Sequence, residues 1–403
     1  MKPTPRLHIV LPVMNESAFL PGFLASLQQQ RYRDWELTVC VNQYDGWWEM
    51  PEKKDICEDN RKSLALLQQW KQFPVTLIDR SSPGKGWSAK KGGVGHARKT
   101  VMDAVAARAG DHDIMVSMDA DTRYPSGYLL ELATWFRSHP HHLGLSLPYF
   151  HVLTGNPEHD RLILRYEIYM RHYALNMIRI QNPYRFTALG SAMAFPVWAY
   201  RKVGGLTPVP GGEDFYFLQK LVKTGPIGYT ASATAYPSSR FSDRVHFGTG
   251  PALIKGRKGQ WDAYPFYPET LFEKVKETFH RFPALFEHDM ATPMDSFLKQ
   301  TFKTDDLWGP LRKNFKDPIH FVKACTGKVD GLRILQFLKT NFPGKGSEVK
   351  PLTAFLQNHF PQTLTEKEME ELESKGFERA DLMLLIRLRQ RLYFIENAQR
   401  RQG

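Results

Sequence analysis

Two kinds of apolar pattern alternate along the first 150 residues. Residues 7–13, 36–41, 75–79, 114–118 and 143–147 are short runs rich in Val, Ile and Leu, which is typical of buried strands. Between the runs, apolar side chains recur at helical spacing, in residues 19–27, 61–70, 97–105 and 126–136. Strands that alternate with helices predict βαβ units and a mainly parallel sheet.

The pattern changes in the second half of the chain. Residues 161–179 are amphipathic, and residues 213–224 form a helical pattern that Gly225 and Pro226 end. Beyond residue 260 the strand pattern is absent, and four helical stretches alternate with Pro and Gly breaks, at 270–282, 318–340, 366–375 and 379–399. We therefore predict an α/β domain over residues 1–260 and an α-helical region over 261–403.

Composition narrows the class of protein. With 42% hydrophobic and 24% charged residues, the chain is typical of globular proteins. Its net charge of +12 favours anionic partners, but no five consecutive Lys or Arg residues occur, so a nucleic-acid tail is not indicated. Three distant cysteines form no CxxC pair, and neither a signal peptide nor an 18-residue apolar run is present. These features predict a cytoplasmic protein.

Carboxylates at the end of a predicted strand are the strongest chemical signal. Asp119 and Asp121 follow the strand at 114–118 directly. They offer oxygen ligands to a hard divalent cation such as Mg²⁺ or Mn²⁺, which keeps open positions for phosphate oxygens. Taken alone, the same residues are also typical of a solvated acidic turn.

Two further segments carry candidate chemistry. Glu213 and Asp214 follow a glycine pair at a helix start, where they either cap the helix or place a general base in a cleft. Residues 83–98 are rich in Gly, Lys and Arg, which suits close approach to phosphate. That loop lacks the Walker A pattern, and a mobile surface loop is the alternative.

The order of these motifs resembles a known family. Residues 9–16 (IVLPVMNE), a strand about twenty residues later, a Gly/Ala/Arg segment, a strand ending in Asp-Ala-Asp, and then Gly-Glu-Asp follow one another over residues 7–222. This series is similar to the family 2 glycosyltransferases, which have the GT-A fold. The resemblance implies a GT-A-like, Rossmann-like, mainly parallel sheet with flanking helices, and a hexosyltransferase-type enzyme that uses a nucleotide-sugar donor.

The resemblance also implies roles for individual residues. Asp119 would bind the ribose or the metal and Asp121 the metal, whereas Asp214 would be the catalytic base and Glu213 would support it or hold the acceptor. The remaining donor-binding positions are these: Val13, Asn15 and Glu16 at the nucleotide, Arg98 with Lys90 or Lys91 at the base or phosphates, and Gly190 and Ser191 beside the sugar.

Several positions depart from the family pattern or extend it. Asn42 and Gln43 stand where the family often has acidic residues that read the base. The processive Gln-x-x-Arg-Trp motif and its membrane helices are absent, which favours transfer of a single sugar. His246 is a candidate third metal ligand, although a lone histidine is more often structural.

The predicted function is thus metal-dependent transfer of one sugar to an acceptor hydroxyl with inversion, in surface glycan or glycolipid synthesis. The acceptor would be a glycan, a lipid-linked molecule or a small molecule. Arg-rich residues 379–403 allow peripheral contact with an anionic membrane, with packing against the catalytic domain or a second subunit as the alternative. A nucleotidyltransferase acting on a sugar phosphate and a non-catalytic glycan-binding module remain the competing hypotheses.

Overall fold

The computed structural model describes residues 4–244, 248–342, 344 and 348–402. Its internal contacts divide the chain into two units. One consists of Met1–Ile163 and Thr187–Gly259, and the other of Leu164–Phe186 and Gln260–Gly403. The second unit therefore includes a segment from the middle of the sequence, Leu164–Phe186, in addition to the residues after Gly259.

The first unit is built on a seven-stranded sheet. The strands are β1 (Leu7–Val13), β2 (Trp35–Asn42), β3 (Val75–Arg80), β4 (Ile114–Ser117), β5 (Gly144–Ser146), β6 (Met193–Pro196) and β7 (Ile227–Tyr229). Their order is β3-β2-β1-β4-β6-β5-β7, and only β6 runs antiparallel to its neighbours. The predicted fold class is confirmed in its architecture: a mainly parallel α/β sheet with flanking helices, and a helical C-terminal region. The strands β6 (MAFP) and β7 (IGY) were not predicted, because Ala, Pro and Gly leave them without a run rich in Val, Ile and Leu.

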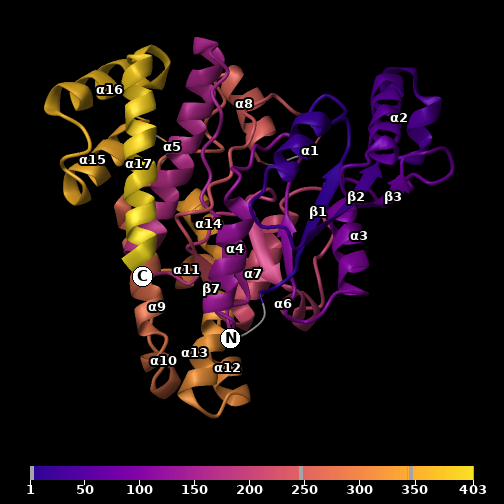
Figure 1. The fold of residues 1–403 in the computed structure, drawn as a ribbon. Helices are drawn as coiled ribbons and strands as arrows, with labels where there is room; N and C mark the ends of the chain where they lie inside the picture. The colour runs from indigo at the N-terminus through magenta and orange to yellow at the C-terminus, as the bar shows by residue number, and fades with distance from the viewer. Residues whose placement is uncertain (1–3, 245–247, 343, 345–347, 403) are drawn as a thin grey trace. The chain divides into compact units, whose positions relative to one another are not determined.

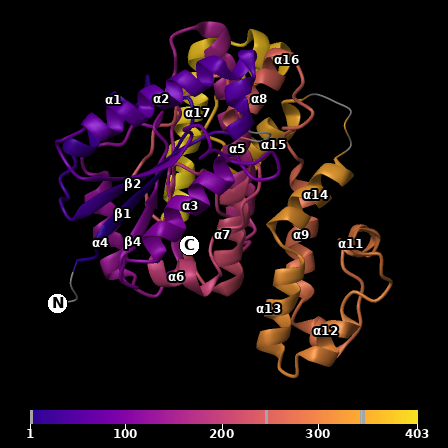
Figure 2. The ribbon, with the colours of Figure 1, turned by 90° about the vertical axis from the view of Figure 1, so that its right-hand side faces the viewer.

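Helices cover both faces of this sheet (Figures 1 and 2). Leu7, Ile9, Leu11 and Val13 of β1 join one hydrophobic cluster with α1 (Leu20–Gln28) and α4 (Tyr128–Ser138). Helix α3 (Val94–Ala106) contacts β1 and β2 and packs on the other face. Successive side chains of a strand point to opposite faces, so a continuous apolar run such as β1 serves both layers.

Most of the other elements of the first unit connect successive strands, and the last of them follows β7. They are η1 (Asp45–Glu49), η2 (Pro51–Lys53), α2 (Lys54–Gln69), α6 (Val197–Lys202), α7 (Glu213–Thr224) and α8 (Thr249–Arg257). Helix α7 spans the predicted residues. Helix α2 begins seven residues before the predicted start at residue 61, because its first turns are polar and give no apolar period.

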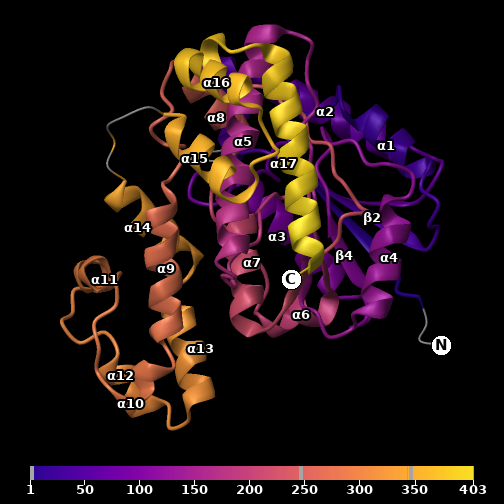
Figure 3. The same cartoon turned by 90° about the vertical axis from the view of Figure 1, so that its left-hand side faces the viewer.

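The second unit consists of helices in its described residues. They are the part of α5 (Pro157–Arg179) from Leu164 onward, α9 (Glu269–Arg281), α10 (Ala284–Glu287), α11 (Asp295–Phe302), α12 (Gly309–Asn314), α13 (Pro318–Lys328), α14 (Gly331–Asn341), α15 (Lys350–His359), α16 (Glu366–Arg379) and α17 (Leu382–Gln402). Helix α9 lies beside α14, and α16 beside α15 (Figures 2 and 3). The single helix predicted over 318–340 is two helices, because Asp330 caps a new one by accepting a hydrogen bond from the Arg333 amide.

Buried ion pairs join α5 to α17 inside this unit. Arg171 donates to Glu167 at 2.6 Å and to Glu396 at 2.7 Å, and all three side chains are at most 5% exposed. Leu384, Leu385, Leu388 and Leu392 of α17 are buried on the same helix as Glu396, whereas Met383 and Phe394 stay exposed. No helix in the described ranges is long and apolar enough to cross a membrane. Membrane contact stays a prediction.

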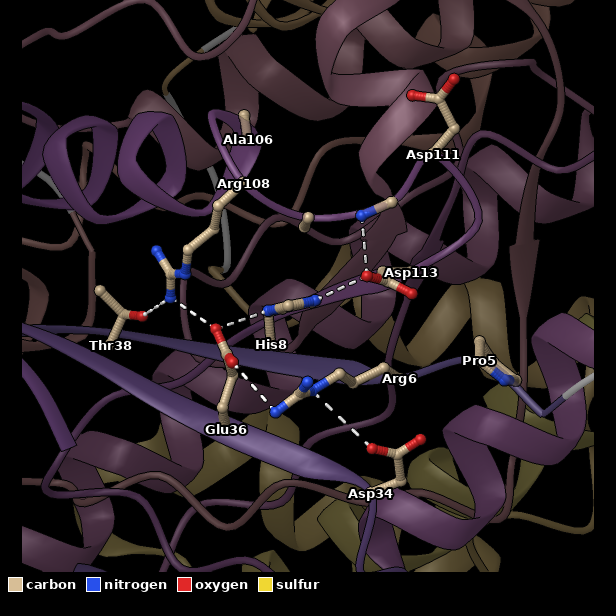
Figure 4. Close-up of polar contacts among 12 residues, drawn as sticks. Pro5, Arg6, His8, Asp34, Glu36, Thr38, Ala106, Arg108, Asp111 and Asp113 are labelled. Atoms are coloured by element: carbon tan, nitrogen blue, oxygen red, sulfur yellow. Dashed lines mark hydrogen bonds and ion pairs between the residues drawn. The ribbon is translucent and has the colours of Figure 1, made fainter. Parts of the chain in front are cut away.

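Figure 4 shows a polar network at the end of the sheet where β1 and β2 begin. His8 lies between two carboxylates, with Nδ1 at 2.9 Å from Glu36 Oε1 and Nε2 at 3.0 Å from Asp113 Oδ2. Arg108 donates to Glu36 and to the Thr38 hydroxyl. Burial alone would raise the pKa of Glu36, but the hydrogen bonds from His8 and Arg108 outweigh it and lower this pKa.

We expect Glu36→Gln to lower the free energy of unfolding by about 1–3 kcal/mol near neutral pH, because it leaves His8 and Arg108 without their charged acceptor. A lowered pKa stabilises the folded state above the ordinary pKa of a glutamate, and this contribution is lost as the pH falls through the folded-state value. The variant should therefore lose less stability on acidification than the parent. Urea unfolding across that pH range measures this. Asp34→Asn is the control, since Asp34 is 60% exposed and should change stability by less than about 0.5 kcal/mol.

Candidate functional site

The candidate site lies at the edge of the sheet where parallel strands β1, β2 and β4 end. Asn15 follows β1, Asn42 is the last residue of β2, and Asp119 follows β4. In open α/β sheets, ligands bind beyond the carboxyl ends of the strands. The sheet thus brings three predicted segments to one edge.

The loop after β1 is held by buried amides. The side chain of Val13 is buried, and its carbonyl accepts a hydrogen bond from Asn42 Nδ2 at 2.8 Å. Asn15 has a left-handed φ of 57°, which asparagine tolerates, and its amide donates to Asn60 Oδ1 at 2.8 Å. Asn42 also accepts from the Trp87 indole. Both polar atoms of the Asn42 side chain are therefore bonded to protein groups.

The turn after β4 is fixed by Tyr124. The Tyr124 hydroxyl accepts from the Asp119 amide at 3.1 Å and donates to the Ser191 carbonyl at 3.0 Å. One hydroxyl thus ties the Asp119–Asp121 turn to the loop predicted to lie beside the donor sugar. Ser191 is itself 3% exposed, and its contact in this structure is made by the backbone.

The guanidinium group of Arg98 contacts three other segments of the chain. Nε donates to Glu213 at 3.0 Å, Nη2 donates to Asp119 at 3.0 Å, and Nη1 donates to the Ser117 hydroxyl at 2.6 Å and to the Gly190 carbonyl at 3.1 Å. Burial would lower the pKa of Arg98, but the carboxylates of Asp119, Glu213 and Asp214 raise it, so Arg98 stays charged. We call these residues, Arg98 with Ser117, Asp119, Gly190 and Glu213, the Arg98 cluster.

A second group of charges surrounds Glu16. Its Oε1 accepts hydrogen bonds from both Arg240 and Arg244, and Arg240 Nε lies 2.9 Å from Asp121 Oδ2. Glu16 is 5% exposed, and within the described ranges its Oε2 has no hydrogen-bond partner. We call Glu16, Asp121, Arg240 and Arg244 the Glu16 cluster. Both arginines keep about a quarter of their side chains exposed.

Helix α7 presents its two acidic residues differently. Glu213 is 4% exposed and faces Arg98, whereas Asp214 is half-buried and its Oδ1 accepts from the Phe215 amide at 2.7 Å. Burial raises the pKa of Asp214, the charge of Arg98 opposes this, and Asp119 adds to the rise. A carboxylate with a raised pKa at a site edge suits proton abstraction. Glu213 is also raised in pKa by burial, against the effect of Arg98.

The Gly/Lys-rich loop was predicted to approach phosphate, and its basic residues differ in how exposed they are. Lys90 and Lys91 are exposed, and Arg98 at its far end is buried. A Cβ on Gly95 would lie 2.2 Å from the Val209 carbonyl oxygen, so this glycine permits α3 to begin against the chain that precedes α7. The donor-binding roles of Lys90 and Arg98 stay predictions.

The net charge of the site and its carboxylate oxygens fit a divalent cation. With Asp214, the two clusters hold five carboxylates and three guanidinium groups, a net charge of −2 when all are ionised. Burial, followed by the charges of Glu16 and Asp119, raises the pKa of Asp121 to about 6. Asp119 and Asp121 are hard oxygen ligands, and a divalent cation would relieve this excess of negative charge.

The described part of the chain contains no group of three or more His, Cys, Asp or Glu side chains that could hold a metal ion. Water and phosphate oxygens would therefore have to complete the coordination of a cation on Asp119 and Asp121. The other candidate ligand, His246, lies outside the described residues.

Sequence reasoning missed several residues that build this site. Tyr124, Ser117 and Asn60 each make a buried contact with a predicted site residue or its backbone. No local signal marks them, since a tyrosine, a serine and an asparagine in strands, turns and helices are common. The pairing of Arg240 and Arg244 with Glu16 was also not predicted.

Comparisons with known proteins find distant structural likenesses. No protein-family model matches the chain, and no curated protein matches it. Among solved structures, S. aureus TarS 1–349 in complex with UDP-GlcNAc aligns at 12% identity with a TM-score of 0.40, covering 83% of this chain and 90% of that one. The mannosyltransferase PcManGT from Pyrobaculum calidifontis, in complex with GDP-Man and Mn²⁺, aligns at 14% identity with a TM-score of 0.40, covering 98% and 88%. These likenesses are distant, and a functional assignment has to rest on the residues of this chain.

Proposed function

We propose that this chain is a metal-dependent glycosyltransferase that moves a single sugar from a nucleoside-diphosphate sugar to an acceptor hydroxyl with inversion. The observation that carries the proposal is the convergence of three distant segments. Arg98 contacts both Asp119, at the end of β4, and Glu213, beside Asp214 at the start of α7. Asp119, proposed for the donor side, and Glu213, proposed for the acceptor side, thus both accept hydrogen bonds from Arg98.

The donor would lie along the strand ends with its diphosphate near the Glu16 cluster. Arg240 and Arg244 are accessible cations beside Asp121, and guanidinium groups suit phosphate oxygens. Asp119 and Asp121 would hold Mg²⁺ or Mn²⁺, which supplies Lewis-acid stabilisation of the departing diphosphate when bound. Asn15 and Glu16 would border the nucleotide, and Gly190 and Ser191 the sugar.

The acceptor reaction follows from the place of Asp214. Its carboxylate would take the proton of the acceptor hydroxyl, and the oxygen would attack the anomeric carbon from the side opposite the diphosphate. The carbon–oxygen bond to the diphosphate breaks, and its electron pair leaves with the nucleoside diphosphate. One displacement inverts the anomeric configuration. The acceptor would be a glycan, lipid-linked or small-molecule hydroxyl of surface glycan or glycolipid synthesis.

We expect the purified chain to release a nucleoside diphosphate from one member of a panel of UDP-, GDP- and dTDP-sugars when Mn²⁺ or Mg²⁺ is present. EDTA should abolish the release, because the net charge of the site then repels the diphosphate. Thermal shift with each nucleotide measures binding separately from turnover. Release of pyrophosphate would instead identify a nucleotidyltransferase, and the absence of metal-dependent nucleotide binding would favour a non-catalytic module.

A further inference from the structure

Arg98 has almost no capacity left for a ligand. A guanidinium group has five N–H donors, and four of them are used in hydrogen bonds to Glu213, Asp119, Ser117 and the Gly190 carbonyl. The residue is 2% exposed. Glu213 is buried, with 5% of its side chain exposed, whereas 35% of the Asp119 side chain is exposed. A phosphate that displaced Glu213 would leave a buried carboxylate unpaired, at a cost of several kcal/mol.

The partners of Arg98 come from separate parts of the site. Ser117 is in β4 and Asp119 in the turn after it, whereas Gly190 precedes β6 and Glu213 begins α7, 115 residues along the chain. The site is shaped to admit the guanidinium, because a Cβ on Gly190 would lie 2.5 Å from Arg98 Nη2. One side chain therefore sets the spacing between the metal-side turn, the sugar-side loop and the helix that carries Asp214.

We infer that Arg98 is a positioning residue that holds the donor-side turn and the catalytic helix in register, acting through Asp119 and Glu213 without touching the donor. This inference rests on the proposed function. Its physical reason is geometric, since a displacement of about 1 Å between reacting groups costs on the order of 10² in rate. The positive charge adds a second effect, because it opposes the rise that burial causes in the pKa of Asp214.

The experiment compares Arg98→Lys with Lys99→Met, a charge-removing control on the next residue of α3 whose ammonium pairs with Asp103. For each variant, kcat is measured at saturating donor and acceptor. The affinities of the nucleoside diphosphate and the nucleoside monophosphate are measured by calorimetry with Mn²⁺. We expect Arg98→Lys to lower kcat about 10²-fold or more and to leave the ratio of the two affinities unchanged. Lys99→Met should change neither quantity.

Two further variants guard against a folding defect. Gly190→Ala moves Arg98 without altering any charge, and it should lower kcat with the same unchanged affinity ratio. Glu213→Gln combined with Arg98→Lys should be no slower than the worse single variant, because the two residues act as one unit. If Arg98 did not act through Glu213, the effects of the two substitutions on the activation free energy would add instead.

Specific results overturn the inference. If Arg98→Lys weakens the diphosphate about tenfold relative to the monophosphate, Arg98 is a phosphate ligand. An unchanged kcat in Arg98→Lys or Gly190→Ala would also contradict it. Failure of the proposed function is a different outcome, since the parent chain would then show no metal-dependent nucleotide binding.

Discussion

Asp214→Asn is expected to lower kcat for sugar transfer by about 10²–10⁴-fold, the usual contribution of a general base. The substitution preserves the shape of the side chain and the oxygen that accepts from the Phe215 amide, but it removes the basic carboxylate. Donor affinity should change little, because Asp214 is proposed to act on the acceptor hydroxyl. Steady-state kinetics with saturating donor, together with calorimetry of the nucleoside diphosphate, measures both effects.

The parent enzyme should also show the pH dependence of this base. The group must be deprotonated to act, and burial raises the pKa of Asp214, so kcat should fall as the pH drops through a value above the ordinary aspartate range. Asp55→Asn, an exposed carboxylate in the first turn of α2, is the control and should leave kcat and its pH profile unchanged. An active Asp214→Asn variant would remove Asp214 from the catalytic role.

Arg240→Gln is expected to weaken binding of the nucleoside diphosphate about 10–10²-fold, which corresponds to the loss of one charged hydrogen bond worth about 1.5–3 kcal/mol. Arg240 is the cation that touches both Glu16 and Asp121, and no partner is found in the described ranges for its Nη1. Binding of the nucleoside without phosphates should be unaffected. Calorimetry with the nucleoside and with its diphosphate measures the two affinities separately.

The same variant should bind Mn²⁺ alone at least as tightly as the parent, because Asp121 loses a competing cation. Arg257→Gln removes an equal charge from the exposed end of α8 and is the control, with both affinities expected to stay near those of the parent. Equal weakening of nucleoside and diphosphate by Arg240→Gln would indicate a collapsed loop rather than a lost phosphate contact.

The features that depend on residues close in the sequence were predicted, and those that depend on distant residues were not. Strands β1 to β5 were predicted because each lies in a run rich in Val, Ile and Leu, and Asp119 was predicted because it follows such a run directly. Strands β6 and β7 were missed because Met-Ala-Phe-Pro and Ile-Gly-Tyr form no such run, so that pairing with neighbouring strands decides them. The helices after residue 260 were predicted as a class, but the break at Asp330 depends on a single cap.

The candidate site shows the same limit. The sequence placed Asp119, Asp121 and Asp214 at element ends, and it assigned Glu16 and Arg98 to the donor by resemblance. In the structure Glu16 is buried against Arg240 and Arg244, and Arg98 is enclosed by its four partners. Burial and pairing of charges depend on segments that are far apart in the chain, and no local spacing reports them.

The sequence by itself determined the alternation of strands and helices and the positions of the acidic residues, because both depend on neighbours a few residues away. The tertiary structure decided which of the charged side chains face one another. That choice required the contacts of Arg98 with Gly190 and Glu213, which lie 92 and 115 residues away, and a buried charge is tolerated only where such partners meet it.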